Sequence, residues 1–340
     1  MVASSWPSGW TIRPATLDDV ELAVNMFNAR SRKFYGENQS TVEEMAGWWK
    51  SSRLDLFLDT RIVLDQRGRM MGWSHTGNPG DPYVCITCGA IVHPEVEGNQ
   101  ELWDGLYSWA LERAWEYISL APRDAKVIAV ESAMEVDPAR RLAVERAGFE
   151  MVRVANRMRI DLEDNPCEPA FPNGIHVRTA DIEADLRSVV AADVEAFRDH
   201  WGHVERPFEE EVEVWQDYIQ SEGEMLDPAL WFLAAEGDEI VGFSVCSGHI
   251  ADDLTRGYVD GLCVRPAWRK RGIALALLHH SFAELHRRGR TAVELDMDSE
   301  NLTGALRLYE RAGMRVVRRT LSYEKVLRDG RDLVTRELTT

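Results

Sequence analysis

The chain has 340 residues, and at roughly 100 to 200 residues per domain this length excludes a single small module and favours two domains. With 45% hydrophobic and 28% charged residues, its composition is that of an ordinary globular protein rather than a disordered or fibrous one. The 57 acidic and 39 basic residues give a formal charge of -18. This charge argues against partners such as nucleic acid or an anionic membrane, because both require a positive field.

The cysteine pattern and the N-terminus indicate a cytoplasmic protein. Five cysteines, at positions 85, 88, 167, 246 and 263, form an odd and scattered set, which argues against a disulfide framework. Cys85 and Cys88 lie in an apolar, strand-like segment without a second cysteine pair, so we expect structural thiols and no metal site. No apolar run approaches the roughly 18 residues that span a bilayer, and the first ten residues lack a signal-peptide pattern.

The chain repeats itself at a fixed spacing. Arg13 and Arg178 each end a short strand-like segment that precedes an acidic helix start. Gly148 and Gly313 each follow the tripeptide Glu-Arg-Ala, and both pairs are 165 positions apart. The repeat predicts two homologous domains, 1–165 and 175–340, joined by a proline-containing linker at 166–174.

The second half reads as an alternation of strands and helices. Apolar segments at 231–235, 240–246, 258–264 and 292–297 predict strands, and helical spacing of apolar residues predicts a helix over 273–288. A further helix is expected to begin at Asn301 and to end at Gly313. This pattern predicts an α/β half with a mixed sheet.

A basic, glycine-containing turn between a strand and a helix is the most informative segment. Arg269, Lys270 and Arg271 precede Gly272, and the next helix begins near Ile273. A glycine that adopts left-handed angles at a helix N-terminus exposes backbone N–H groups to an anion, so the turn is typical of a phosphate cradle. A solvated basic turn is the alternative.

The motif Arg269-x-x-Gly272-x-Ala274, followed by Asn301 and by Tyr309 four residues before Gly313, resembles the signature of the GCN5-related N-acetyltransferase (GNAT) superfamily. The resemblance implies two tandem GNAT-like domains with splayed central strands, acetyl-CoA as co-substrate and no metal. It also implies that the turn binds the pyrophosphate of acetyl-CoA and that the preceding strand and Asn301 bind the pantetheine arm. The implied cofactor-binding residues are Leu262, Cys263, Val264, Arg269, Lys270, Arg271, Gly272, Ile273, Ala274 and Asn301.

The resemblance also assigns catalytic roles. Tyr309 stands where the family supplies the proton to the departing thiolate, although packing alone would also explain a tyrosine on an apolar helix face. Asn301 would serve equally well as a helix N-cap. Asp260 is the predicted general base, with His249, Asp296 and Asp298 as alternatives and a water chain as another.

The first half departs from this motif. Aligned through the repeat, it has Glu97 in place of Arg269 and Gln100 in place of Gly272. The other replacements are Leu102 for Ala274, Val144 for Tyr309 and Val136 for Asn301. Because an acidic turn repels pyrophosphate, we expect a degenerate, non-catalytic first domain.

The acceptor is expected to be a primary amine of a small molecule. Eight carboxylates between 205 and 224 would attract a cationic amine, although a solvated helix face explains them too. Trp215 and Tyr218 could line the acceptor site or belong to the core. One alternative is the cysteinyl amine of a thiol pseudodisaccharide, the acceptor of a tandem branch with a similar arrangement. Another is a non-catalytic acyl-CoA-binding or scaffold protein. The oligomeric state has no signature in the sequence.

Overall fold

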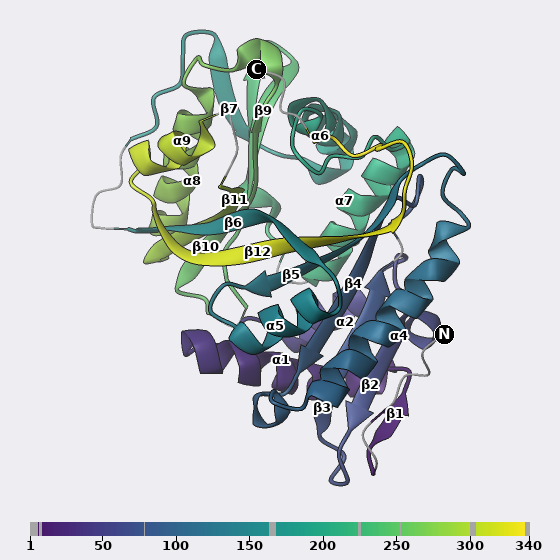
Figure 1. Cartoon of the computed structure of the whole chain (residues 1–340). Coiled ribbons are helices and arrows are strands. Elements are labelled where there is room, and N and C mark those ends of the chain that lie inside the picture. The colour runs from purple at the N-terminus through teal and green to yellow at the C-terminus, as the bar shows by residue number, and fades with distance from the viewer. Residues whose placement is uncertain are drawn as a thin grey trace. The chain divides into compact units, whose positions relative to one another are not determined.

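The computed structural model describes residue 6 and residues 9–77, 79–162, 168–223, 226–251, 253–299 and 304–336 (Figure 1). The chain divides into two compact units, each built from two segments. Unit 1 comprises Met1–Val154 and Arg319–Leu333, and unit 2 comprises Ala155–Arg318 and Val334–Thr340.

Unit 1 contains a sheet with the strand order β1-β2-β3-β4-β5-β12. Its strands are β1 (Thr11–Arg13), β2 (Thr60–Leu64), β3 (Met70–Gly77), β4 (Cys85–Val92), β5 (Val127–Met134) and the later part of β12 (Arg315–Arg328). Its helices are α1 (Val20–Tyr35), α2 (Val42–Trp49), α3 (Leu56–Asp59), α4 (Gln100–Ile118) and α5 (Pro138–Arg146), with the 3-10 turns η1 (Leu17–Asp19) and η2 (Pro94–Val96).

Helices cover both faces of this sheet because successive strand residues point to opposite sides. On one face Trp73 of β3 stacks on Trp49 of α2, with ring centroids 4.8 Å apart. On the other face α4 packs along β3 and β4, as the ribbon in Figure 1 shows. Gly72 lies on that side, where an added Cβ would meet Leu106 and Leu102 of α4 at 3.2 and 3.3 Å.

Unit 2 repeats this layout with the strand order β6-β11-β10-β9-β8-β7. Its strands are the later part of β6 (Glu150–Asp161), β7 (Ile175–Thr179), β8 (Trp231–Glu236), β9 (Glu239–Ser247), β10 (Arg256–Val264) and β11 (Ala292–Asp298). Its helices are α6 (Ile182–Phe197), α7 (Phe208–Glu222), α8 (Ile273–Arg287) and α9 (Ala305–Arg311), with η4 (Pro228–Leu230) and η5 (Pro266–Trp268).

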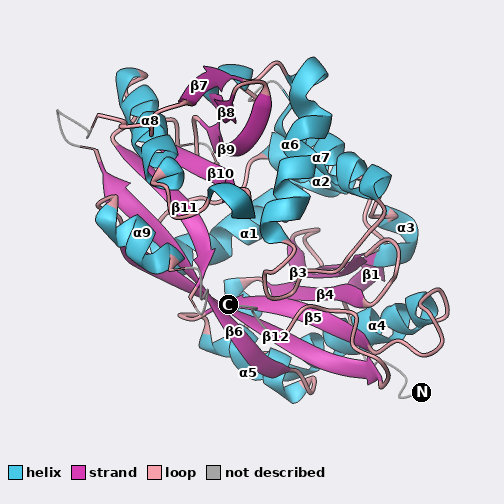
Figure 2. Cartoon of the chain, turned by 90° about the horizontal axis from the view of Figure 1, so that it is seen from above, coloured by secondary structure: helices cyan, strands magenta, loops and turns pink. Residues whose placement is uncertain are grey.

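Two apolar clusters form the core of unit 2, one on each face of the sheet. Val241 and Cys246 of β9 face the cluster that contains α8, whereas Phe243 and Val245 face the cluster that contains α6. Trp215 of α7 joins the second cluster, in which its ring meets Phe243 edge to face with centroids 5.7 Å apart. Figure 2 shows α8 on one side of β10, and α6 and α7 on the other.

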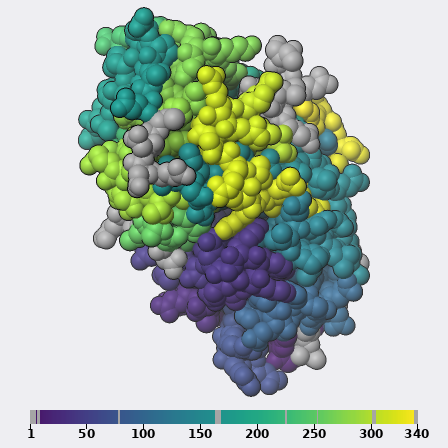
Figure 3. Space-filling model, turned by 90° about the vertical axis from the view of Figure 1, so that its left-hand side faces the viewer, coloured from purple at the N-terminus to yellow at the C-terminus, as the bar shows by residue number. Residues whose placement is uncertain are grey.

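Each unit takes one strand from the other half of the sequence. In unit 1, β12 pairs with β5 from Thr320↔Met134 to Arg328↔Val127. In unit 2, β6 pairs with β11 from Ala292↔Asp161 to Asp298↔Ala155. The compact units therefore differ from the contiguous halves that the repeat predicts. Much of β12 is exposed, and the yellow C-terminal residues form part of the surface in Figure 3.

The strands and helices expected in the second half are present to within two residues at each end, with one exception. The last helix, α9, begins at Ala305 with Gly304 as its N-cap, later than the expected start. Asn301, to which we assigned the N-cap and a contact with the pantetheine arm, lies outside the described residues.

Candidate active site

The two central parallel strands of unit 2 diverge after a short paired stretch. β10 and β11 pair from Arg256↔Ala292 to Tyr258↔Glu294, and this register covers only three residues of each strand. Beyond that point β10 pairs with β9 alone, and β11 pairs with β6. No described strand covers the edge of β10 between Val259 and Val264. Because backbone N–H and C=O groups in a sheet interior need partners, this edge can accept an extended ligand as an added strand.

A β-bulge lies at the point where β10 turns away from β11. The register with β9 shifts between Val259 and Gly261, so Asp260 is the extra residue. A bulge bends its strand and redirects the extra side chain. Asp260 keeps part of its surface accessible to solvent, although protein atoms surround much of its carboxyl group.

Asp260 is the centre of a small polar cluster. Ser247 Oγ donates a hydrogen bond to Asp260 Oδ2 at 2.7 Å and lies 3.4 Å from Glu222 Oε2. His249 Nε2 is 3.5 Å from the same Glu222 oxygen, and its Nδ1 lies 3.2 Å from the Ala251 carbonyl. His249, the alternative base, is therefore held against Glu222 and the backbone.

The surroundings of Asp260 raise the pKa of its carboxyl to about 7. Loss of hydration among the surrounding protein atoms is the largest cause, and the negative charge of Glu222 acts in the same direction. The hydrogen bonds from Ser247 and Tyr218 oppose the rise. A carboxylate with a pKa near neutrality can exchange protons with an amine at physiological pH.

The helix after the basic turn has an open N-terminus. Gly272 is the N-cap of α8 with φ +86°, and no side chain caps the first turn of the helix. An added Cβ at Gly272 would meet no atom within 4 Å, so the space around it is free. Lys270 also adopts a left-handed conformation, with φ +63°. No side chain therefore occupies the first-turn N–H groups of α8, and these groups are the donors that an anion site at a helix N-terminus uses.

The three bases of the turn have different roles. Arg269 folds back, because its Nη1 is 2.8 Å from Asp199 Oδ2 and its Nη2 donates to the Ala196 carbonyl at 2.6 Å. Arg271 Nη2 is 2.8 Å from Glu236 Oε1. Among the described residues, Lys270 has no ion pair, so its ammonium is the charge that the turn leaves available to an anion.

Tyr309 lies on α9 in the apolar cluster that also contains Val259 and Val264 of β10 and Met297 of β11. Burial raises the pKa of its phenol to about 12, so the hydroxyl keeps its proton throughout the neutral range. No described residue hydrogen-bonds to this hydroxyl. A protonated phenol without a partner can donate to a ligand atom.

Most of the remaining predicted residues have side chains that pack into the apolar clusters of unit 2. The Cys263 side chain is buried in the cluster beside α6, and burial raises the pKa of its thiol well above its ordinary value. Ile273 is buried in the α8 cluster, against which Leu262 and Ala274 pack. Asp296 is held by Arg157, whose Nε lies 2.7 Å from Asp296 Oδ1, and by the Tyr258 hydroxyl at 2.9 Å. These two contacts occupy Asp296, one of the alternative bases.

The matching region of unit 1 has the same splay but a closed turn. β4 and β5 pair only from Cys85↔Ile128 to Thr87↔Val130. The N-cap of α4 is Asn99, whose side chain accepts a hydrogen bond from the Leu102 N–H at 3.1 Å. Val144, at the position of Tyr309, is fully buried and has no polar group to offer.

Two kinds of feature were absent from the part of the chain that the structure describes. No described helix is long and apolar enough to cross a bilayer. The described residues contain no group of three or more His, Cys, Asp or Glu side chains that could hold a metal ion.

The sequence and the fold of the chain are similar to those of known acetyltransferases. Residues 194–314 match the acetyltransferase (GNAT) family. The chain is 34% identical over 245 residues to a mycothiol acetyltransferase of Streptomyces scabiei (strain 87.22), covering 72% of each protein. It superposes on a GCN5-related N-acetyltransferase from Sphaerobacter thermophilus with a TM-score of 0.78 and 30% identity, covering 98% of this chain and 100% of that one. A tandem GNAT protein from the clavulanic acid biosynthesis pathway gives a TM-score of 0.70 at 14% identity, covering 95% and 100%.

The fold and the matched sequence thus define an acyltransferase of the α/β type with splayed central strands. The chain belongs to the GNAT acetyltransferase family. The predicted fold class and family are confirmed.

Proposed function

We propose that unit 2 transfers the acetyl group of acetyl-CoA to the primary amine of a small molecule, and that unit 1 lacks this activity. The observation that carries the proposal is the unpaired edge of β10, which leads directly into the uncapped N-terminus of α8. An extended arm that ends in a pyrophosphate fits this combination, because the strand edge offers backbone partners and the helix offers free N–H groups.

The residues present suit acetyl-CoA. Lys270 and the N–H groups that follow Gly272 would hold the pyrophosphate, and Arg269 would fix the shape of the turn through Asp199. The N–H and C=O groups of β10 from Val259 to Val264 would bind the pantetheine arm. Acetyl-CoA supplies the activated carbonyl carbon that the amine attacks.

The chain's own residues would manage the protons. Asp260 and Glu222 attract the ammonium form of the acceptor, and Asp260 takes its proton directly or through a water molecule. Unpaired N–H groups on β10 can polarise the thioester carbonyl. The Tyr309 phenol donates its proton towards the sulfur of the departing thiolate.

The raised pKa of Tyr309 disfavours complete transfer of its proton to the sulfur. With a phenol pKa of about 12 and a thiol near 8.5, complete transfer in the free enzyme would be uphill. We therefore assign Tyr309 the role of a hydrogen-bond donor whose bond to sulfur strengthens as negative charge develops there. It stabilises the thiolate without forming a buried phenolate.

A cysteinyl amine is the first acceptor to test. The Streptomyces scabiei relative, which is similar over 72% of both chains, is named a mycothiol acetyltransferase. The tandem arrangement of this chain, with one degenerate half, is also similar to that branch of the family. The carboxylates of Asp260 and Glu222, both in contact with Ser247, suit the small ammonium group of such an acceptor.

The experiment is an acceptor panel in which the free thiol released from acetyl-CoA is followed continuously. The panel contains a cysteinyl amino-sugar conjugate, amino sugars, polyamines, amino acids and short peptides. We expect turnover with at least one small primary amine, and its loss when Gly272 is replaced by Glu. Binding of acetyl-CoA without turnover of any amine would support the alternative of a non-catalytic acyl-CoA-binding protein.

A further inference from the structure

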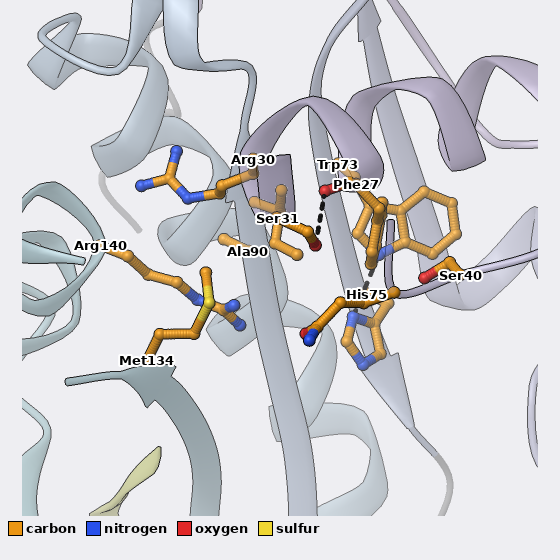
Figure 4. A pocket seen from close by; sticks show the side chains of 11 residues that line it. Phe27, Arg30, Ser31, Ser40, Trp73, His75, Ala90, Met134 and Arg140 are labelled. Atoms are coloured by element: carbon orange, nitrogen blue, oxygen red, sulfur yellow. Dashed lines mark hydrogen bonds between the residues drawn. The ribbon is translucent and has the colours of Figure 1, made fainter. Parts of the chain in front are cut away.

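A cavity of about 310 Å³ lies in unit 1, where β4 and β5 diverge (Figure 4). Ala90 and Ile91 of β4 and Met134 of β5 line it, together with Phe27 and Trp73. Its volume is about twice that of the roughly 150 Å³ protein cavity that holds one benzene ring. The space therefore suits a two-ring compound, or one ring with a short chain.

This cavity is closed to an arm of the acyl-CoA type. Arg30, which is 1% exposed, lies between the ends of β4 and β5. Its Nη1 donates to the Val92 carbonyl at 2.7 Å. Its Nε and Nη2 donate to the two carboxylate oxygens of Asp137, each at 2.5 Å. The following turn carries Glu97, which pairs with Lys33. A guanidinium thus occupies the free end of β4, and a carboxylate stands where a pyrophosphate would lie.

The charged side chains that line the cavity are both cationic, and Ser31, Gln39 and Ser40 add neutral polar groups. Arg30 and Arg140 line it, whereas the carboxylates that balance them, Asp137 and Glu131, do not. Arg140 Nη2 is 2.7 Å from Glu131 Oε1, so one edge of this guanidinium is held by a carboxylate. A ligand carboxylate would add a second, charge-assisted partner to the same guanidinium.

His75 supplies a second donor from the opposite wall. Trp73 Nε1 lies 3.2 Å from His75 Nδ1, and because an indole N–H can only donate, Nδ1 must accept and Nε2 must carry the proton. Burial, together with the positive charge of Arg140, lowers the pKa of His75 to about 4, so the ring is neutral. Gly89 makes room for this ring, since an added Cβ would lie 2.1 Å from His75 Cε1.

We propose that this cavity binds a small carboxylate with an aromatic body of about two rings, its oxygens accepting from the Arg140 guanidinium and from His75 Nε2. In Figure 4, Arg140 and Met134 lie on one side of the cavity and Trp73 and His75 on the other, so the ligand would lie between them. Phe27, Ile91 and Met134 would contact the rings. The two guanidiniums exclude an ammonium ligand of the same shape. This site does not depend on acetyl transfer by unit 2.

The test is a calorimetric titration of the full chain with 2-naphthoate, and with 2-naphthylmethylamine as the charge-reversed control. We expect naphthoate to bind with a Kd below about 1 mM, and the amine to bind at least tenfold more weakly. Absence of naphthoate binding at millimolar concentration, or equal binding of the amine, would overturn the proposal.

Two variants locate the binding. Ala90→Phe fills the cavity and should weaken naphthoate binding at least tenfold, while Gly272→Glu, in unit 2, should leave it unchanged. The double variant Glu131→Gln with Arg140→Met removes both charges together, so no buried carboxylate loses its partner, and it should abolish the preference for the carboxylate. Undiminished naphthoate binding by folded Ala90→Phe, or displacement of naphthoate by CoA in Gly272→Glu, would contradict the assignment.

Discussion

The turn before α8 combines two properties, a left-handed backbone conformation at Gly272 and the uncapped, positive N-terminal end of the helix. Replacement of Gly272 by two different residues separates them. At φ +86° any other residue is strained, at a cost of about 1 to 2 kcal/mol, but no atom lies close enough to clash with a new side chain. Gly272→Gln and Gly272→Glu share that strain, so the difference between them isolates one negative charge.

The size of that difference follows from Coulomb's law. A carboxylate about 6 Å from a phosphate, at an effective dielectric constant of about 20, adds roughly 3 kcal/mol of repulsion, or about 100-fold in Kd. Salt screens part of it, so we expect Gly272→Glu to bind CoA roughly 10- to 100-fold more weakly than Gly272→Gln. The difference in the Kd for CoA between the two variants should become smaller as ionic strength rises.

Isothermal titration with CoA measures both variants without turnover. Gly98→Glu, in the corresponding turn of unit 1, is the matched control, because an added Cβ there also meets no atom within 4 Å. It should bind CoA as the wild type does. If Gly272→Glu and Gly272→Gln bind CoA within about threefold of each other, the pyrophosphate does not lie at the N-terminus of α8.

Four further predictions concern three side chains. The kcat/KM of the wild type should rise with pH through an apparent pKa near 7, because Asp260 loses its proton there. Asp260→Asn should lower kcat/KM and remove its rise with pH. Asp296→Asn should retain that rise. Because the folded pKa of Asp260 is raised to about 7, stability is lost as pH rises from about 4 to about 7, and the full loss is present at pH 8, so Asp260→Asn should raise Tm at pH 8 and not at pH 4. Tyr309→Phe should reduce kcat about 100-fold or more with little change in the Kd for CoA, and an unchanged kcat would remove the acid assignment. Asp137→Ala leaves Arg30 buried without its partner and should cost about 3 to 5 kcal/mol in urea denaturation, and a loss below about 1 kcal/mol would show that the pair is dispensable.

Local patterns in the sequence were sufficient for most of the fold of unit 2. The strand over Arg256–Val264, the turn with Gly272 and the helix over Ile273–Arg287 each carry their own signal of apolar spacing, glycine placement or charge. The repeat also indicated two similar domains. The pairing of β12 with β5 and of β6 with β11 has no local signature, because it joins segments far apart in the chain.

The candidate site divides in the same way. The basic turn and Tyr309 were found from motif spacing, and Asp260 from its place on the strand beside the expected cofactor, whereas the partners of these residues were not found. Asp199 and Glu236 are distant in sequence from the arginines that they hold, and Ser247 reaches Asp260 only because β9 and β10 are antiparallel neighbours. The bulge at Asp260 depends on the register with β9, which sequence alone does not give.

Hydrogen exchange of the full chain with and without acetyl-CoA tests most directly whether the cofactor binds in unit 2 alone. Protection is expected at the backbone amides of Val259–Val264 and at the first turn of α8 after Gly272, with a calorimetric stoichiometry of one acetyl-CoA per chain. No change is expected at the turn and helix start around Asn99. Protection of that region, or its absence along β10 and α8, would contradict the account.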